Sequence, residues 1–186
     1  MLQIIVQGRG GQGAQTAGNL LAAAFYREGK YIQCFATYGG ARRGTPVSSF
    51  IRVDDRPIRL RCDIEHADAI LCFDSSLLKG GLLDRSTNDT LIVVNAGRAS
   101  GDWNGLDGFR ILPIDGIAIA RKHGLGRIVN SSLLGAFVCA LKAPSIDVMQ
   151  QTIAETAPAR KAENVSACLE AYDCTRQLMQ EGLSCQ

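Results

Sequence analysis

The sequence predicts an α/β fold with a mostly parallel sheet and a helical C-terminal part. Short apolar runs alternate with stretches of helical periodicity, and a glycine-rich turn joins the first run to the first stretch. Apolar strands that alternate with helices are typical of a sheet covered on both faces. We therefore expect a three-layer, Rossmann-like sandwich.

One domain accounts for the whole chain, residues 1–186. A chain of 186 residues with 46% hydrophobic residues can bury a core of ordinary size. The sequence contains no internal repeat, low-complexity tract or linker that would divide it.

The N-terminal half begins with a short apolar run at residues 2–7, which predicts a buried strand. Residues 14–28 follow with a stripe of apolar side chains at helical spacing, and Gly29 ends this helix. Further strands are predicted at residues 31–37 and 47–53. Residues 58–61 follow an Asp-Asp-Arg-Pro turn and are expected to pair back as a hairpin.

The middle of the chain contains three more apolar runs. Residues 67–73 are almost continuously apolar, as expected for a strand with both faces covered. Asp74 follows this strand and can cap a short helix that begins at Leu77. Residues 90–95 and 109–113 predict two further strands, and the polar, glycine-rich residues 96–108 between them predict a loop.

The C-terminal part is predicted to be helical from about residue 115. The first helix covers residues 115–123 and is broken by two glycines. Asn130 or Ser131 can cap a helix that runs to residue 143, and Ser145 can cap the next one. The last helix is expected at residues 159–181.

Charge and hydropathy exclude several classes of protein. Twenty basic and 18 acidic residues give a net charge of +2, which does not favour a nucleic-acid binder. No apolar run approaches the roughly 18 residues needed to span a bilayer, and the N-terminus lacks the features of a signal peptide. We expect a cytoplasmic protein without membrane contact.

The cysteines and histidines do not predict a metal site or a catalytic centre within this chain. The seven cysteines include no C-x-x-C pair, and the most closely spaced two, Cys168 and Cys174, would lie on different faces of a helix. His66 and His123 are the only histidines, and each has a structural explanation at the end of an element. We therefore expect no metal or iron–sulfur cluster bound by this chain alone, and we identify no catalytic residue.

The glycine turn between the first strand and the first helix is the strongest candidate binding feature. Backbone N–H groups and the positive end of a helix converge at such a turn, which favours an anion. The turn consists of Gly8, Arg9, Gly10, Gly11, Gln12 and Gly13.

Two ordinary nucleotide motifs are incomplete. The spacing G-x-G-x-x-G suggests a dinucleotide site, but no acid that could hold the ribose lies between Glu28 and Asp54. A P-loop would need Lys-Ser/Thr directly after Gly13, where the chain has Ala14-Gln15-Thr16. The simpler alternative, that the glycines only let the helix pack tightly on the sheet, stays open.

A second glycine-rich loop follows the second predicted strand and carries Arg42, Arg43 and Gly44. Ligands of open parallel sheets bind beyond the carboxyl ends of the strands, and both loops lie at that edge. Guanidinium groups bind phosphate or carboxylate through paired hydrogen bonds. The loops could therefore share one anionic ligand or one partner surface, although a solvated loop or an internal ion pair also explains the arginines.

These motifs together resemble the gamma subunit, or gamma domain, of 2-oxoacid:ferredoxin oxidoreductases. The resemblance runs from residue 2 to about residue 143 and extends into the last helix. It is carried by GRGGQG, by TYGGARRGTPVSSFIRV, by DAILCFD, by RIVNSSLLGAF and by ARKAENVSACLEAYD. The RRG-x-PV form is similar to the pyruvate and branched-chain members.

The resemblance implies a subunit of a multisubunit enzyme that is not active alone. Such an enzyme oxidatively decarboxylates a 2-oxoacid with thiamine diphosphate, Mg²⁺ and [4Fe–4S] clusters, which lie on alpha, beta and delta-type partner subunits. Coenzyme A takes the acyl group, and ferredoxin or a similar acceptor takes the electrons. By the same resemblance, the glycine turn, the Arg42-Arg43-Gly44 loop and Asn130 are expected to face a ligand or an interface.

Three points stay open at this stage. Thr45 stands where the family commonly has alanine, so pyruvate, branched-chain and aromatic 2-oxoacids all remain candidate substrates. A stand-alone dinucleotide-binding dehydrogenase module is the second reading of the glycine turn. A scaffold or regulatory subunit without influence on turnover is the third.

Overall fold

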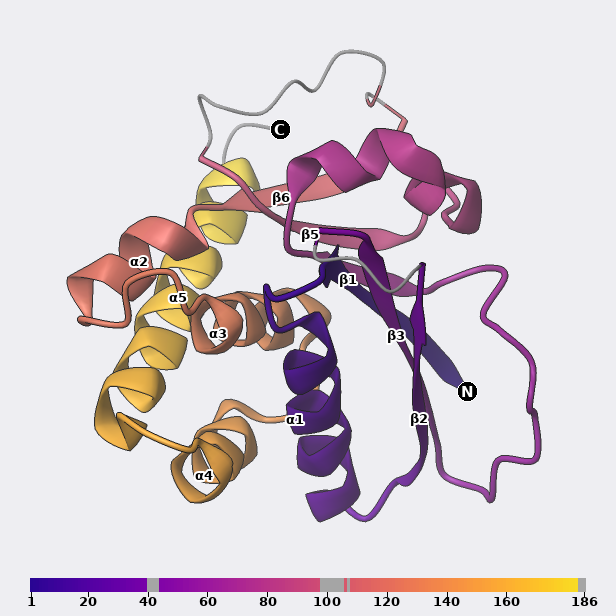
Figure 1. The fold of residues 1–186 in the computed structure, drawn as a ribbon, viewed down its shortest axis with the longest axis horizontal. Coiled ribbons are helices and arrows are strands. Elements are labelled where there is room, and N and C mark those ends of the chain that lie inside the picture. Colours follow the sequence, from indigo (N-terminus) through magenta and orange to yellow (C-terminus); the bar gives the residue numbers. More distant parts are fainter. Residues whose placement is uncertain (40–43, 98–105, 107, 184–186) are drawn as a thin grey trace.

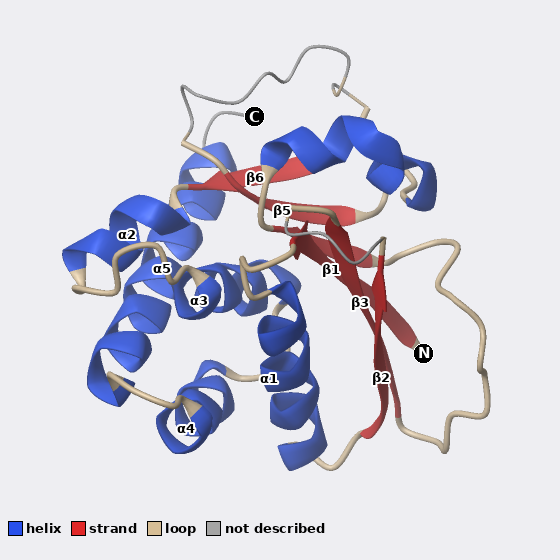
Figure 2. Cartoon of the chain, in the orientation of Figure 1, coloured by secondary structure: helices blue, strands red, loops and turns tan. Residues whose placement is uncertain are grey.

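The computed structural model describes residues 1–39, 44–97, 106 and 108–183. Its centre is a six-stranded sheet in the order β2-β3-β1-β4-β5-β6 (Figures 1 and 2). Five strands run in one direction, and β3 runs against them between β1 and β2. The strands are β1 (Leu2–Arg9), β2 (Tyr31–Tyr38), β3 (Pro46–Asp54), β4 (Ala69–Cys72), β5 (Leu91–Asn95) and β6 (Arg110–Ile114).

Helices cover both faces of the sheet, which confirms the predicted three-layer sandwich. On one face, α1 and α3 pack against the strands, with α4 and α5 behind them (Figure 1). On the other face lie three short helical turns within residues 75–85. The helices are α1 (Ala14–Arg27), α2 (Gly116–Lys122), α3 (Asn130–Leu141), α4 (Ile146–Thr156) and α5 (Lys161–Leu183).

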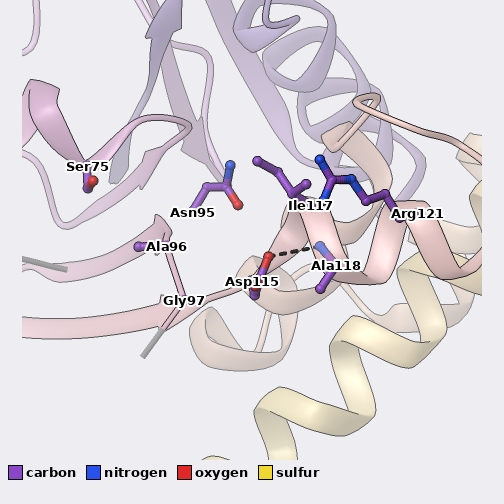
Figure 3. Close-up of a pocket in the computed structure, with 8 residues that line it drawn as sticks. All are labelled: Ser75, Asn95, Ala96, Gly97, Asp115, Ile117, Ala118 and Arg121. Atoms are coloured by element: carbon purple, nitrogen blue, oxygen red, sulfur yellow. Dashed lines mark hydrogen bonds between the residues drawn. The ribbon is translucent and has the colours of Figure 1, made fainter. Parts of the chain in front are cut away.

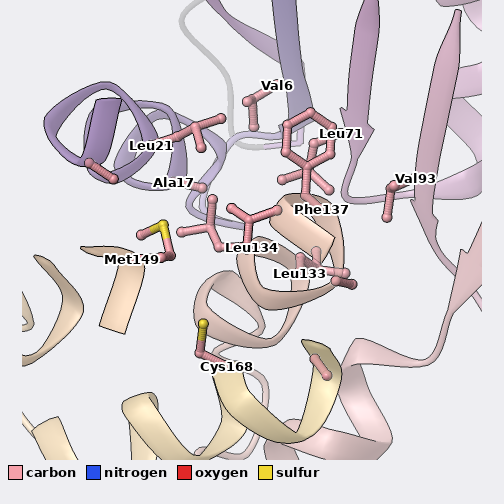
Figure 4. Packing of buried hydrophobic residues seen from close by; sticks show 14 of the residues in the cluster. Val6, Ala17, Leu21, Leu71, Val93, Leu133, Leu134, Phe137, Met149 and Cys168 are labelled. Atoms are coloured by element: carbon pink, nitrogen blue, oxygen red, sulfur yellow. The ribbon is translucent and has the colours of Figure 1, made fainter. Parts of the chain in front are cut away.

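The two cores follow from the alternation of side chains along each strand. In β1, Ile4 and Val6 pack towards α1 and α3, whereas Ile5 packs on the opposite face with Leu78 and Leu82. Figure 4 shows the larger core, where residues of β1, β4 and β5 meet α1, α3, α4 and α5. Since all three β1 side chains are fully buried, this strand reads as a continuous apolar run.

The predicted hairpin at residues 58–61 is wrong. These residues form no strand, because β3 is already paired along its length with β1 on one edge and β2 on the other. The segment instead lies over the sheet and is held by side chains. The carbonyl of Leu60 accepts a hydrogen bond from Gln33, and the carbonyl of Asp63 accepts one of 3.0 Å from Arg52.

Arg52 is the largest polar side chain in the interior, with 1% of its surface exposed. It lies in register with Gln3 of β1 and Gln33 of β2, and donates to their side-chain oxygens at 3.2 and 2.8 Å. The guanidinium is thus buried against neutral acceptors, which satisfy its donors as burial requires. This row of polar side chains anchors the segment that follows β3.

Helix capping was predicted correctly in two places and wrongly in a third. Asp74 accepts from the N–H of Ser76, and Ser145 accepts from the N–H of Val148. In contrast, α3 starts at Asn130 without any side-chain cap. The hydroxyl of Ser131 points to α5 instead, where it donates to Asn164 at 2.7 Å.

Loop and membrane expectations are tested only in part. Most of the predicted loop at residues 96–108 lies outside the described residues, although Leu106 is described and buried. Within the described ranges, no helix has the length and apolar character needed to cross a membrane.

Replacement of Gly135 by alanine is expected to destabilise the fold severely. An added Cβ would lie 1.9 Å from the carbonyl oxygen of Cys168, because α3 and α5 pack backbone to backbone at this point. Overpacking of a core costs about 1–3 kcal/mol, and a clash with backbone lies at the upper end of that range or beyond. Gly108→Ala is the control, since its nearest atom lies 3.9 Å away. Equal urea midpoints for the two variants would contradict this packing.

The Glu170 carboxylate is expected to contribute to acid sensitivity. Burial opposes its ionisation, but Lys122 at 2.9 Å and His123 at 2.7 Å outweigh burial and hold the pKa of Glu170 below its usual value. A lowered pKa in the folded state gives stability that is complete above the unfolded pKa, about 4.3, and is lost as pH falls through the folded pKa. Glu170→Gln should therefore lose less stability than the parent between neutral pH and pH of about 3.5.

The matched control for this measurement is Asp173→Asn on the same helix, where an exposed carboxylate pairs with Arg176. Urea titrations at both pH values should give the Asp173 variant the parent's pH dependence. The same pH dependence for Glu170→Gln as for the parent would contradict the role of this cluster.

Candidate functional site

The glycine turn is held by backbone hydrogen bonds and contains two glycines with left-handed backbone conformation. Gly11 has φ of 94°, and Gly13, which precedes α1, has φ of 89°. The N–H of Gln12 donates to the carbonyl of Arg9, and the N–H of Gly10 donates to the carbonyl of Thr45, both at 2.9 Å. Non-glycine residues rarely adopt this backbone conformation, so both positions need glycine.

Gly8, the first glycine of the turn, has a packing role. A Cβ at this position would lie 3.0 Å from that of Phe73 and 3.1 Å from that of Ala14. Its small size therefore lets the end of β1 approach both the end of β4 and the start of α1. The simpler explanation of the glycines, tight helix–sheet packing, is correct for this residue.

Arg9 connects the turn to two other loops. Its Nε lies 2.9 Å from Asp74 Oδ2, Nη1 donates to the carbonyl of Gly44 at 3.1 Å, and Nη2 donates to Ser76 Oγ at 2.7 Å. The side chain of Gln12 folds back onto the turn, where its Oε1 accepts a hydrogen bond from the backbone N–H of Arg9 at 2.7 Å. Both side chains are thus engaged within the chain.

Asp74 stays ionised in this network. Burial alone would raise its pKa, but the hydrogen bonds from Ser76 and the guanidinium of Arg9 together hold the pKa of Asp74 below its usual value. Its role is to cap a helical turn and to anchor Arg9. Nothing in this arrangement makes it a proton-transfer group.

Asn130, the first residue of α3, lies directly against the turn. A Cβ at Gly13 would lie 2.6 Å from either polar atom of the Asn130 carboxamide. The carboxamide Oδ1 is buried and has no hydrogen-bond partner among the described residues. The structure thus brings together two positions that lie 117 residues apart in the sequence.

The arginine loop is described only at its end. Arg42 and Arg43 lie outside the described residues. Gly44 is described, with φ of 89°, and its carbonyl accepts from Arg9. Since Thr45 also pairs with Gly10, the end of this loop is anchored to the glycine turn, as expected for loops at the same edge of the sheet.

A hollow of about 530 Å³ opens beside the glycine turn, at the carboxyl ends of β1, β4 and β5. A second hollow of about 370 Å³ adjoins it and shares Asn95, Ile117 and Arg121 with it (Figure 3). We call the two together the edge groove. The edge groove lies at the point where the strand order reverses, because β2 and β3 lie on one side of β1 and β4, β5 and β6 lie on the other. Ligands of open α/β sheets usually bind at such a point. The first hollow is lined by Gly10, Gly11, Gln12, Phe73, Asn95, Ile117, Arg121, Arg127 and Val129.

Two cationic residues of the edge groove were not predicted as site residues from the sequence. Arg121 comes from α2 and Arg127 from the connection between α2 and α3, more than a hundred residues after the glycine turn. Each reads as an ordinary surface arginine in the sequence. The start of α2 lies beside the end of β5, where the N–H of Gly116 donates to Asn95, and only this tertiary arrangement brings the two arginines to the turn.

The described residues contain no group of three His, Cys, Asp or Glu side chains placed to hold a metal ion. Burial also raises the pKa of Cys72 and of Cys168 to about 12, so these thiols stay protonated. A thiolate is the form that binds metals and iron–sulfur clusters. In their protonated form, Cys72 and Cys168 therefore do not serve as metal or cluster ligands.

Comparison with known proteins identifies relatives along nearly the whole chain. The family model described as pyruvate ferredoxin/flavodoxin oxidoreductase matches residues 3–176. Pyruvate synthase subunit PorC of Methanothermobacter thermautotrophicus is 40% identical over 180 residues, which cover 93% of this chain and 95% of that protein. The pyruvate/ketoisovalerate oxidoreductases common subunit gamma of Thermococcus kodakarensis is 36% identical, with 94% and 97% covered.

A solved structure agrees with these sequence relatives. The crystal structure of the pyruvate oxidoreductase subunit PORC from Thermotoga maritima superimposes with a TM-score of 0.77 and 27% identity, covering 92% of this chain and 95% of that one. The likeness in fold therefore extends over nearly the whole chain. The chain belongs to the pyruvate ferredoxin/flavodoxin oxidoreductase family.

Proposed function

We propose that this chain is the gamma subunit of a multisubunit 2-oxoacid oxidoreductase. The complex would oxidatively decarboxylate pyruvate or a related 2-oxoacid to acyl-coenzyme A and pass electrons to ferredoxin or a similar acceptor. The observation that carries the proposal is the end-to-end match to proteins that are named as single subunits of such enzymes. The presence of both pyruvate and ketoisovalerate in those names supports pyruvate or a branched-chain 2-oxoacid as the substrate.

Partner subunits of the alpha, beta and delta types would carry thiamine diphosphate, Mg²⁺ and the [4Fe–4S] clusters. The protonated state of the buried Cys72 and Cys168 thiols supports this division of labour, because a thiolate is the form that binds metals and clusters. Coenzyme A would enter as a co-substrate. The chain would then be required for the reaction without supplying a catalytic residue.

The surface that meets a ligand or a neighbouring subunit would be built from the glycine turn and the loop that carries Arg42 and Arg43. Gly11 is the exposed apex of the turn, and no described side chain covers it. Arg9 and Gln12 hold the turn from within, so its backbone geometry is fixed before anything binds. A fixed arrangement of donors loses little entropy on binding, which favours affinity.

Purification of the tagged chain from its native host tests the proposed function. We expect larger subunits to copurify in fixed ratio, together with thiamine diphosphate and iron–sulfur absorption, and we expect pyruvate-dependent reduction of ferredoxin or a dye. An untagged strain taken through the same procedure is the control. A lone monomer without an iron–sulfur partner would refute the proposal.

Gly11→Ala and Gly29→Ala form a matched pair that tests the role of the turn. Both glycines have a left-handed backbone, with φ of 94° and 78°, and an added Cβ meets no atom within 4 Å at either position. Each variant should lose about 1–2 kcal/mol of folding stability. Gly29 lies between the end of α1 and the start of β2, at the opposite end of the strands from the glycine turn. Only Gly11→Ala should therefore weaken assembly or turnover of the complex, by tenfold or more. Equal effects of the two variants on the complex would remove the turn from the functional surface.

A further inference from the structure

The sheet has two outer edges, one along β2 and one along β6 (Figure 2). No other strand of the described chain pairs with either of them. An open strand edge presents unpaired N–H and C=O groups, to which a further strand can bind. The donors of the β6 edge are blocked, whereas those of the β2 edge are open.

The strand β6 offers no N–H group at its outer edge. The carbonyl of Ile114 accepts from the N–H of Ala96 at 3.0 Å, so Ile114 faces β5. Backbone direction alternates along a strand, and Ile111 and Pro113 therefore point outward. Pro113 has no N–H, and the N–H of Ile111 donates to the carbonyl of Phe109 at 3.0 Å. Proline is one of the usual means by which proteins protect an exposed edge.

The outer edge of β2 has the opposite character, and we call it the β2 edge. The N–H of Gly39 donates to the carbonyl of Pro46 at 2.9 Å, so the odd-numbered residues of β2 bond to β3 in the printed register. The backbone groups of the even-numbered residues point away from β3. Within the described residues, no hydrogen bond reaches these outward groups, which belong to Ile32, Cys34, Ala36 and Tyr38.

The β2 edge also lacks the side chains that usually protect such a strand. The eight residues of β2 include neither a charged side chain nor a proline. The flank of α1 beside this edge is neutral as well. Gln15 accepts a hydrogen bond from the hydroxyl of Tyr38 at 2.6 Å, and Asn19 accepts one from the thiol of Cys34 at 3.7 Å. Such a strand is prone to uncontrolled pairing unless a partner covers it.

Exposed aromatic side chains gather at the same edge. Tyr31 and Tyr38, at the two ends of β2, are 50% and 59% exposed. Tyr26, near the end of α1, is 73% exposed and lines one hollow of about 600 Å³ together with Tyr31. Tyrosine is enriched in protein–protein interfaces. The β2 edge thus has both the open backbone and the side chains of an interface.

We propose that β2 pairs with β2 of a second copy of this chain, antiparallel and about a two-fold axis at Phe35, so that the two sheets become continuous. In this register, Ile32 lies opposite Tyr38 of the second copy. Cys34 lies opposite Ala36 of the second copy. All four outward residues of each copy thereby gain backbone partners.

A second copy suits this edge because a two-fold interface brings identical groups together. Identical charges would repel each other there, and β2 has none. On the axis, the two Phe35 residues form a non-hydrogen-bonded pair, in which side chains lie closest, and aromatic pairs across strands are favourable. Phe35 is only partly buried, so part of its ring is available for this contact.

Analytical ultracentrifugation of the purified full chain tests the pairing. We expect a dimer at micromolar concentration. Ala36→Pro should raise the dissociation constant of the dimer at least tenfold, because it removes an outward N–H and leaves every bond to β3 in place. Ala36→Lys should have the same effect, because it brings a charge into the interface. The melting temperatures of both variants should stay close to the parent value, which shows that they fold.

Ile128→Lys is the matched control. Ile128 is also an exposed apolar side chain, but it belongs to the connection between α2 and α3 (Figure 1). This variant should dimerise like the parent. A parent chain that stays monomeric at its highest soluble concentration would overturn the proposal, and so would a dimer that both Ala36 variants leave intact.

A disulfide tests the register. Opposite residues of a hydrogen-bonded antiparallel pair have Cα atoms about 5.5 Å apart, which a disulfide can span. In Ala36→Cys, oxidation with diamide should therefore join Cys34 of one copy to position 36 of the other, as peptide mass spectrometry would show. The parent and the double variant Cys34→Ser, Ala36→Cys are the controls and should not yield this peptide. Its absence from a dimeric Ala36→Cys sample would overturn the axis at Phe35.

Copurification of larger subunits is measured separately, so this pairing and the proposed function can fail independently. A monomeric chain whose Ala36→Pro variant loses the larger subunits would overturn the second copy as the occupant of the β2 edge and leave the proposed function in place. A dimer that the Ala36 variants dissociate, purified without any larger subunit, would support the pairing and refute the proposed function.

Discussion

The guanidinium of Arg9 holds together the loops at the carboxyl ends of β1 and β4. It leaves the end of β1 and reaches Asp74 and Ser76 after β4 and the carbonyl of Gly44 before β3. Three loops that are remote in sequence thereby become one rigid surface. The lowered pKa of Asp74 follows from this contact and from Ser76, so the carboxylate stays charged and Arg9 stays in place across the neutral range. The side chain of Arg9 thus fixes the glycine turn from its buried side, and Gly11 stays exposed to solvent.

The antiparallel strand β3 gives the glycine turn a different meaning from that in dinucleotide enzymes. In those folds, a parallel strand beside the first one ends in the acid that holds the ribose. Here β3 runs the other way and begins, rather than ends, next to the turn, with Pro46 opposite Arg9. The strand that ends on that side is β2, one strand further from β1, and its last residue is Tyr38 rather than an acid. The open space lies instead on the other side of β1, above β4 and β5, where α2 supplies Arg121 and Asp115.

Most of the fold was predictable because the spacing of hydrophobic residues shows which side chains are buried. The period of the buried positions in turn distinguishes a helix from a strand. The fully covered strands β1, β4 and β5 and the helix α1 were read from that signal alone. The hairpin at residues 58–61 failed because the sequence does not show that both edges of β3 are taken. Asn130 was predicted as a cap from its residue type, but contact with Gly13 decided its place. Of the edge groove, the glycine turn was predictable and the two arginines were not, since only the tertiary arrangement brings them together.

Several ionisable groups of the described chain are engaged in holding the structure. Asp74 anchors Arg9, Glu170 binds Lys122 and His123 between α2 and α5, and Cys72 is a protonated buried thiol. A group that is bonded in this way is poorly placed to exchange a proton or an electron with a substrate. Arg121 and Arg127 are the contrast, because they lie in a groove and no described group neutralises them. Asp74 and Glu170 thus have partners within the chain, whereas Arg121 and Arg127 have none among the described residues.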